Sequence, residues 1–110
     1  MTPMKLLALV CRYYGLGNLK QLAETARPDL WRYAVLDEAR QVACWLLQRH
    51  CDLSEEELQT VLKRLKWSNV FIRAEAFKAT RKLDEGCYSL RLAVQNIEQI
   101  ILSTFASLKL

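Results

Sequence analysis

The sequence predicts an all-α fold, a bundle of five to six helices with one long central helix. Apolar residues recur at steps of three and four along most of the chain, which is the period of an amphipathic helix. The 110 residues include only 3 glycines and 2 prolines, so few positions interrupt a helix. The composition, 52% hydrophobic and 25% charged, excludes a disordered chain and predicts a globular one.

The N-terminal part of the chain contains signals for two short helices. Thr2 followed by Pro3 is typical of a helix start, and the apolar spacing then predicts a helix over about residues 4–14. Asn18 can cap a second helix, which we expect to run to about residue 25.

The long central helix is predicted over residues 30–50, because this segment contains neither Gly nor Pro. Its apolar side chains form one stripe, which we expect to face the core. The stripe consists of Trp31, Val35, Val42, Ala43, Leu46 and Leu47. We also expect Trp45 to pack in the core.

Two further helices joined by a short turn are predicted over residues 54–83, an arrangement that indicates a helix-turn-helix. Ser54 precedes Glu57 by three residues, which is the spacing of a capping box. After a polar interruption at residues 66–68, Asn69 can cap the second of these helices. The inner faces are expected to carry Leu58, Val61, Leu62 and Leu65 in the first helix, and Val70, Ala74 and Phe77 in the second.

A last helix follows Gly86 and is expected to pack back on the others. Its apolar residues, at alternating steps of three and four, are Leu90, Val94, Ile97, Ile101 and Phe105. No repeat, low-complexity segment or linker divides the chain, so we expect a single domain over residues 1–110.

The cysteines, at positions 11, 44, 51 and 87, include no Cys-x-x-Cys pair, and His50 is the only histidine. We therefore expect buried free thiols and neither a metal nor a cofactor. A single histidine gives no positioned acid–base set, so we expect no enzyme activity and no small-molecule substrate. The apolar run at residues 4–10 is too short to span a bilayer, and no cleavage site follows it. We expect a cytoplasmic protein without a membrane partner.

Three stretches of the sequence resemble one known family. Residues 6–16 are similar to an apolar first helix that ends in a tyrosine pair. Residues 39–46 read Ala-Arg-Gln-Val-Ala-Cys-Trp-Leu and are similar to the family's Ala/Pro-Arg-Gln-Ile/Met-Ala-Met-x-Leu segment. Residues 53–58 stand where that family opens its motif with Ser-Leu-x-Glu-Ile. Over residues 4–103 the chain thus resembles the C-terminal DNA-binding domain, domain IV, of the bacterial replication initiator DnaA, which has a Trp-repressor-like helix-turn-helix.

The resemblance implies a module that binds double-stranded DNA in bacterial replication or transcription regulation. The family's most specific phrase, Gly-Gly-Arg-Asp-His-Ser/Thr-Thr-Val, corresponds here to Lys-Arg-Leu-Lys-Trp-Ser-Asn-Val at residues 63–70, which retains Val70. The resemblance therefore implies the family's fold, and it does not imply recognition of the initiator's own DNA sites.

Six residues are candidates for contacts with DNA. In a helix-turn-helix the second helix enters the major groove, where its first residues reach base edges and nearby cations bind phosphates. Ser68, Asn69 and Arg73 lie where base or phosphate contacts are expected, and Asn69 and Arg73 are the candidates for reading bases. The candidates for phosphate contacts are Lys63, Lys66 and, in the family's basic segment, Arg32. The net charge of +4 permits a polyanionic partner without requiring one.

Several of these residues also have a purely structural interpretation. Asn69 can be a plain helix cap, and Lys63 and Lys66 can complement the dipole at a helix end. Arg32 can pair with a neighbouring aspartate, Asp29 or Asp37, at the surface.

Acidic residues near the motif oppose DNA binding. Glu55, Glu56 and Glu57 begin its first helix, and Glu75 is expected on the outer face of its second helix, where a carboxylate repels phosphate. We expect Trp67, in the turn, to be the most exposed aromatic residue. The alternative function is therefore a protein-interaction module on the same scaffold that has lost DNA recognition.

Overall fold

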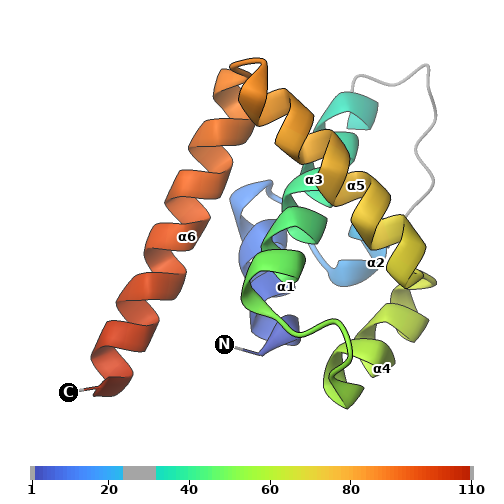
Figure 1. The fold of residues 1–110 in the computed structure, drawn as a ribbon, viewed down its shortest axis with the longest axis vertical. Helices are drawn as coiled ribbons and strands as arrows, with labels where there is room; N and C mark the ends of the chain where they lie inside the picture. The colour runs from blue at the N-terminus through green and yellow to red at the C-terminus, as the bar shows by residue number, and fades with distance from the viewer. Residues whose placement is uncertain (1, 24–31, 110) are drawn as a thin grey trace.

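All of the regular structure in the described residues is helical, as the sequence predicts. The computed structural model describes residues 2–23 and 32–109, with side chains at residues 2–23 and 34–103. Six helices follow one another in this part of the chain (Figure 1): α1 (Pro3–Tyr13), α2 (Leu19–Ala23), α3 (Arg32–His50), α4 (Glu56–Leu65), α5 (Asn69–Asp84) and α6 (Tyr88–Lys109). The expected all-α fold of five to six helices is confirmed.

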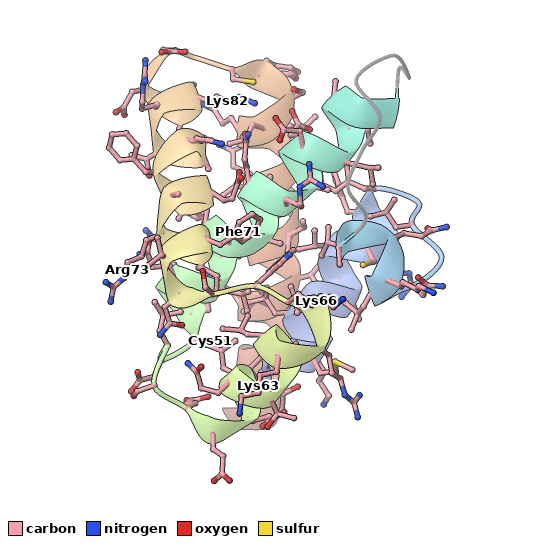
Figure 2. The ribbon with its side chains drawn as sticks, turned by 90° about the vertical axis from the view of Figure 1, so that its right-hand side faces the viewer. Cys51, Lys63, Lys66, Phe71, Arg73 and Lys82 are labelled. Atoms are coloured by element: carbon pink, nitrogen blue, oxygen red, sulfur yellow. The ribbon has the colours of Figure 1, made fainter. Side chains whose placement is uncertain are left out.

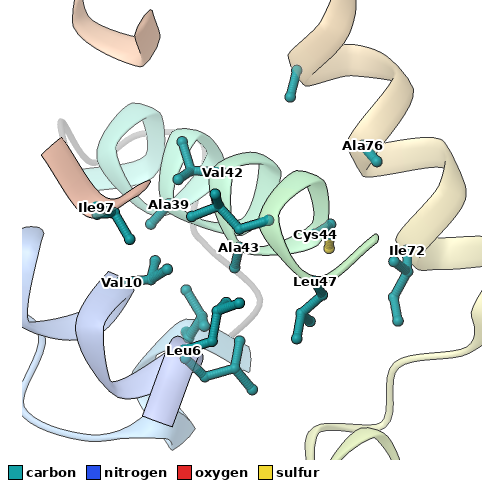
Figure 3. Packing of buried hydrophobic residues seen from close by; sticks show 14 of the residues in the cluster. Leu6, Val10, Ala39, Val42, Ala43, Cys44, Leu47, Ile72, Ala76 and Ile97 are labelled. Atoms are coloured by element: carbon teal, nitrogen blue, oxygen red, sulfur yellow. The ribbon is translucent and has the colours of Figure 1, made fainter. Parts of the chain in front are cut away.

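α3 is the central helix of the bundle. α1, α5 and α6 all pack against it, and α4 packs against α1 and α2. In Figure 3, Leu6 and Val10 of α1 lie on one side of α3, and Ile72 and Ala76 of α5 lie on the other. The fully buried side chains of α3 include Ala39, Val42, Ala43, Cys44, Leu46 and Leu47. Because α3 is apolar on most of its circumference, it has to be covered from several sides.

The predicted stripe of α3 is confirmed in its C-terminal half and is wrong at Val35. Val42, Ala43, Leu46 and Leu47 are fully buried, whereas Val35 is exposed and Trp31 lies outside the described residues. Trp45, expected in the core, is half-buried, and the guanidinium of Arg49 lies 5.1 Å from its ring centroid. An indole can leave the core at small cost when a cation covers its face.

The two N-terminal helices begin with the predicted caps. The hydroxyl of Thr2 accepts a hydrogen bond from the backbone N–H of Lys5 at 3.2 Å. Asn18 Oδ1 accepts one from the N–H of Gln21 at 3.0 Å. Both bonds satisfy N–H groups that have no partner inside their own helix. The expected continuation of α2 to residue 25 lies outside the described residues.

The capping box predicted for α4 is wrong. The N-cap residue is Glu55, whose side chain makes no capping bond. Ser54 instead donates its hydroxyl to Asp52 Oδ1 at 2.7 Å, and its backbone N–H donates to the same oxygen at 2.9 Å. Asp52 therefore holds Ser54 in a local turn that precedes the helix. The predicted inner face of α4 is confirmed, since Leu58, Val61, Leu62 and Leu65 are all buried.

The predicted register of α5 is also wrong. Ser68, and not Asn69, is the N-cap, because its hydroxyl accepts a bond from the N–H of Phe71 at 3.0 Å. The buried residues of α5 are Ile72, Glu75, Ala76 and Ala79, whereas Val70, Ala74 and Phe77 are exposed. α5 has apolar residues on two faces, and the face with two alanines lies against α3. Small side chains allow two helix axes to approach closely, which explains this choice.

α6 packs back on the bundle as expected. Its residues Leu90, Val94, Ile97 and Ile101 are buried, and it lies against α1, α3 and α5. The side chain of Phe105 lies outside the described part of α6. None of the described helices combines the length and the apolar character that crossing a membrane requires.

All four cysteines are free thiols, as predicted. Cys11 and Cys44 are buried, whereas Cys51 and Cys87 are half-buried, so the expectation of burial is correct for two of them. Burial raises the pKa of the Cys11, Cys44 and Cys51 thiols above the ordinary value. Within residues 2–23 and 32–109, no group of three His, Cys, Asp or Glu side chains is arranged to hold a metal ion.

Candidate nucleic-acid interface

α4 and α5 are joined by a tight turn at residues 66–68. Lys66 ends α4 in the left-handed region, with φ 59° and ψ 33°. In this conformation its N–H bonds the carbonyl of Lys63 at 3.2 Å, and the N–H of Trp67 bonds the carbonyl of Leu62 at 2.9 Å. These two bonds satisfy carbonyl groups at the end of α4, so the turn is well defined.

Trp67 anchors this turn from the inside. The expectation that it is the most exposed aromatic residue is wrong, because its side chain is buried in the core. Its ring lies 5.3 Å from that of Phe71, one turn into α5, in a tilted arrangement. Phe71 is half-buried against the same core. The left-handed backbone at Lys66 reverses the chain, and the next side chain packs inward.

The outward side of α5 is a continuous exposed surface. It consists of Val70, Arg73, Ala74 and Phe77, which recur at the spacing of one helical face. Val70 is 75% exposed and Phe77 is 63% exposed. We call these four residues the outward face of α5.

Glu75 does not lie on this face, contrary to the sequence-based expectation. It is 7% exposed, because it shares the inner face of α5 with Ile72 and Ala79. One carboxylate oxygen lies 3.4 Å from Lys78 Nζ. Burial, and then the nearby Glu75 carboxylate, raise the pKa of Cys44, which indicates that Glu75 lies close to α3. From residue 69 to residue 81, α5 therefore exposes no acidic side chain.

The predicted basic residues are exposed in two separate groups. Lys63 and Lys66 lie at the end of α4 and in the turn, and Figure 2 shows them on a different side of the molecule from Arg73. Arg73 extends away from the bundle on the outer side of α5. None of the three makes an ion pair within the part of the chain that the structure describes. Their charges are therefore available to an external anion.

Ser68 and Asn69 stand at the start of α5, and both have internal contacts. The Ser68 hydroxyl is the helix cap, and Asn69 Oδ1 lies 3.4 Å from Gln59 Nε2 on α4. The structural interpretation of a cap thus applies to Ser68 rather than to Asn69. Asn69 is exposed, and its long contact with Gln59 leaves its amide nitrogen available to a ligand.

Arg32 is the first residue of α3, and its side chain lies outside the described residues. In Figure 2, α3 begins at the upper right, away from the turn that carries Lys66. The start of α3 is thus separate from the turn that carries Lys66. The predicted pairing of Arg32 with Asp29 also lies outside the described residues.

The acidic start of α4 is exposed. Glu55, Glu56 and Glu57 are all exposed, and Glu56 and Glu57 occupy the first turn of the helix. Carboxylates there complement the helix dipole. Because carboxylates repel an anionic ligand, such a ligand is expected at the other end of α4, where Lys63 and Lys66 lie.

Sequence reasoning missed the outward position of Val70 and Phe77. The signal that identifies it is the pair Ala76 and Ala79, because two small residues at this spacing favour close helix packing. It also missed the contact of His50 with α6, where His50 Nε2 lies 2.7 Å from Glu98 Oε2.

Comparisons with known protein families, with curated proteins and with solved structures matched none of them to this chain. The resemblance to DnaA domain IV consequently stays a prediction from the sequence.

Proposed function

We propose that this chain binds double-stranded DNA, with α5 lying in the major groove as the second helix of a helix-turn-helix. The observation that carries the proposal is the outward face of α5, which nothing in the described chain covers and which contains Arg73 but no acidic side chain. A helix with one uncovered, acid-free face fits the major groove, which is about 12 Å wide.

The side chains supply the chemistry that such a complex needs. Arg73 can donate two hydrogen bonds to a guanine, and Asn69 can pair with an adenine. Val70 and Phe77 are suited to apolar contacts with base edges, such as the methyl group of thymine. Lys63 and Lys66 lie to one side of α5, where they can neutralise the phosphates that border the groove. The contribution of Arg32 to phosphate binding is part of the same proposal.

A second candidate function is a protein-interaction module, which the exposure of Val70 and Phe77 favours. Large apolar side chains on one helical face often mark a protein contact. The two functions differ in the residue that dominates, since DNA binding depends on Arg73 and a protein contact depends on Phe77.

The first test is fluorescence anisotropy of the chain against a labelled random DNA duplex pool, at low and at physiological salt, with sequencing of the bound fraction. We expect binding that weakens steeply as salt rises and that enriches a short sequence. Absence of binding even at about 50 mM salt contradicts DNA binding.

Arg73→Ala should then weaken binding to the enriched duplex by about 1 to 3 kcal/mol, or roughly 5- to 150-fold. The matched control is Arg12→Ala, which removes the same charge from an exposed position on α1. Equal effects of the two variants would show that only net charge matters. If the chain binds no duplex but retains a partner from a nuclease-treated cell extract, and Phe77→Ala loses it, the second candidate function replaces the first.

A further inference from the structure

The outward face of α5 places one cation between two apolar side chains. Arg73 follows Val70 by three residues and precedes Phe77 by four, so the three side chains lie in one row along the helix. All three are exposed. A ligand that removes the two apolar side chains from water must also offer an acceptor for the guanidinium between them. We call these three residues the α5 row.

The core fixes the direction in which the α5 row points. Ile72 is fully buried, and Phe71 is half-buried with its ring 5.3 Å from that of Trp67. Figure 2 shows Arg73 on the outer side of α5, away from Phe71. Rotation of α5 about its axis would expose Ile72 to water, which is unfavourable. The α5 row is therefore held outward before any ligand binds.

The floor of the major groove offers the pattern of groups that the α5 row requires. Guanine presents two acceptors there, and the 5-methyl group of thymine is the apolar group. Side chains spaced by three or four residues along a helix in this groove contact successive bases. The α5 row thus matches three successive base pairs, with the guanine of Arg73 in the middle and a methyl group on each side.

Asn69 independently favours a methyl group on the side of Val70. Its side chain is exposed and can pair with an adenine. The thymine opposite that adenine carries its methyl group in the same groove. Because Val70 directly follows Asn69, one A·T base pair can supply a partner for both side chains.

We propose that the α5 row recognises a guanine flanked by pyrimidines that carry a 5-methyl group, and that Phe77 determines the preference for one of these methyl groups. This inference rests on the proposed function, because it names the feature of the DNA that the same helix recognises. In unmodified DNA the methylated pyrimidine is thymine. 5-Methylcytosine carries its methyl group at the same ring position, so methylation of a cytosine beside the guanine strengthens binding as well.

The test begins with the duplex that is enriched from the random pool. We expect its sequence to contain thymine beside guanine. Each such thymine is then replaced in turn by deoxyuridine, which keeps the base pairing and removes only the methyl group. Fluorescence anisotropy should show binding about fourfold weaker for each methyl group removed, which corresponds to the burial of one such group.

A second set of duplexes tests the methyl group in a different base. The A·T base pair at each of these positions is replaced by G·C, with either cytosine or 5-methylcytosine. The duplex with 5-methylcytosine should bind about fourfold more tightly than the duplex with cytosine. Equal binding of the two duplexes overturns the proposal.

Variants of the α5 row assign each methyl group to its side chain. Phe77→Ala should lose the response to one of the thymine replacements and keep the response to the other, and Val70→Ala should show the reverse. Phe77→Leu keeps an apolar side chain and should retain both responses. The matched control is Arg12→Ala, which changes an exposed residue of α1 and should also retain both. All variants should keep the helical circular dichroism of the parent, because no core side chain is changed.

The outcome that contradicts the role of Phe77 is a Phe77→Ala variant that responds to every thymine replacement like the parent. The methyl groups would then act through the shape of the DNA rather than through this contact. Failure of the inference also differs from failure of the proposed function. A chain that binds the enriched duplex and responds to no replacement still binds DNA, so only the inference is wrong. A chain that binds no duplex at about 50 mM salt contradicts both.

Discussion

The backbone of Lys66 stores a small amount of strain. Among the described residues it is the one non-glycine residue with a positive φ, and an L-residue in the left-handed region costs about 1–2 kcal/mol. We predict that Lys66→Gly raises the free energy of unfolding by about 0.5–1 kcal/mol. Glycine removes the backbone cost, and the conformational entropy that it adds to the unfolded chain offsets part of this gain. Urea unfolding of the parent and the variant measures the difference.

Lys66→Ala is the matched control, since alanine removes the charge and keeps the backbone cost. Its stability should stay within about 0.5 kcal/mol of the parent. If Lys66 binds phosphate, the DNA binding of both variants should depend less on salt than that of the parent. The slope of the logarithm of the binding constant against the logarithm of the salt concentration should be shallower by about one unit. A loss of stability in Lys66→Gly contradicts the predicted gain.

We predict that Ser68 contributes more to stability than its neighbour Asn69. Ser68→Ala removes the acceptor for the Phe71 N–H, so we expect a loss of about 1 kcal/mol in thermal or urea unfolding. Asn69→Ala should change stability by only a few tenths of a kcal/mol, because Asn69 does not cap α5. A larger loss of stability in Asn69→Ala than in Ser68→Ala would indicate that Asn69 is the cap.

At the scale of the helices, Glu98 connects the end of α3 to α6. One oxygen of its carboxylate contacts both His50 and Arg49. We predict that Glu98→Ala lowers the free energy of unfolding by about 1–2 kcal/mol, because a partly buried, charge-assisted contact is lost. A double-mutant cycle with His50→Ala measures the coupling, and strict additivity of the two changes would contradict a direct interaction.

The helices themselves are predictable from the sequence, whereas the rotation of α5 is not. Caps such as Thr2 and Asn18 act within one turn, so local sequence determines them. The rotation of α5 depends on whether Val70 and Phe77 or Ala76 and Ala79 meet α3, and both sets have helical spacing. Packing between helices distant in sequence makes that choice.

The candidate site shows the same division between local and distant information. Exposure of Lys63, Lys66 and Arg73 follows from their chemistry, because a long charged side chain is seldom buried without a partner. The positions of Trp67 and Glu75 depend on contacts with other helices. A buried glutamate violates the usual pattern, and sequence alone therefore placed it outside.

At the scale of the whole molecule, buried thiols make the fold sensitive to alkaline pH. Burial raises the pKa of Cys11, Cys44 and Cys51 above the ordinary value of 9.0. Above pH 9 the unfolded chain loses thiol protons that the folded chain keeps, so ionisation favours unfolding. The stabilisation is complete below pH 9 and is lost as pH rises through the raised pKa values.

We predict that the free energy of unfolding falls above about pH 9, by at most about 1.4 kcal/mol per pH unit for each thiol. Urea unfolding at several pH values measures this decline. In Cys44→Ala the decline should be shallower than in the parent, because one of the three thiols with a raised pKa is absent. An unchanged slope in that variant would contradict the contribution of Cys44.

The close packing of α3 on α5 also determines how often each helix opens. Amide protons in a native protein exchange with deuterium only when their segment opens, and segments open with different free energies. Because α5 packs closely on α3, amides in these two helices should exchange slowest, near the rate of global unfolding. Among the described helices, α4 packs against α1 and α2 and meets α5 through the long contact of Gln59 with Asn69, so it should open more often. α4, which carries Lys63, would then open and close many times for each opening of α5.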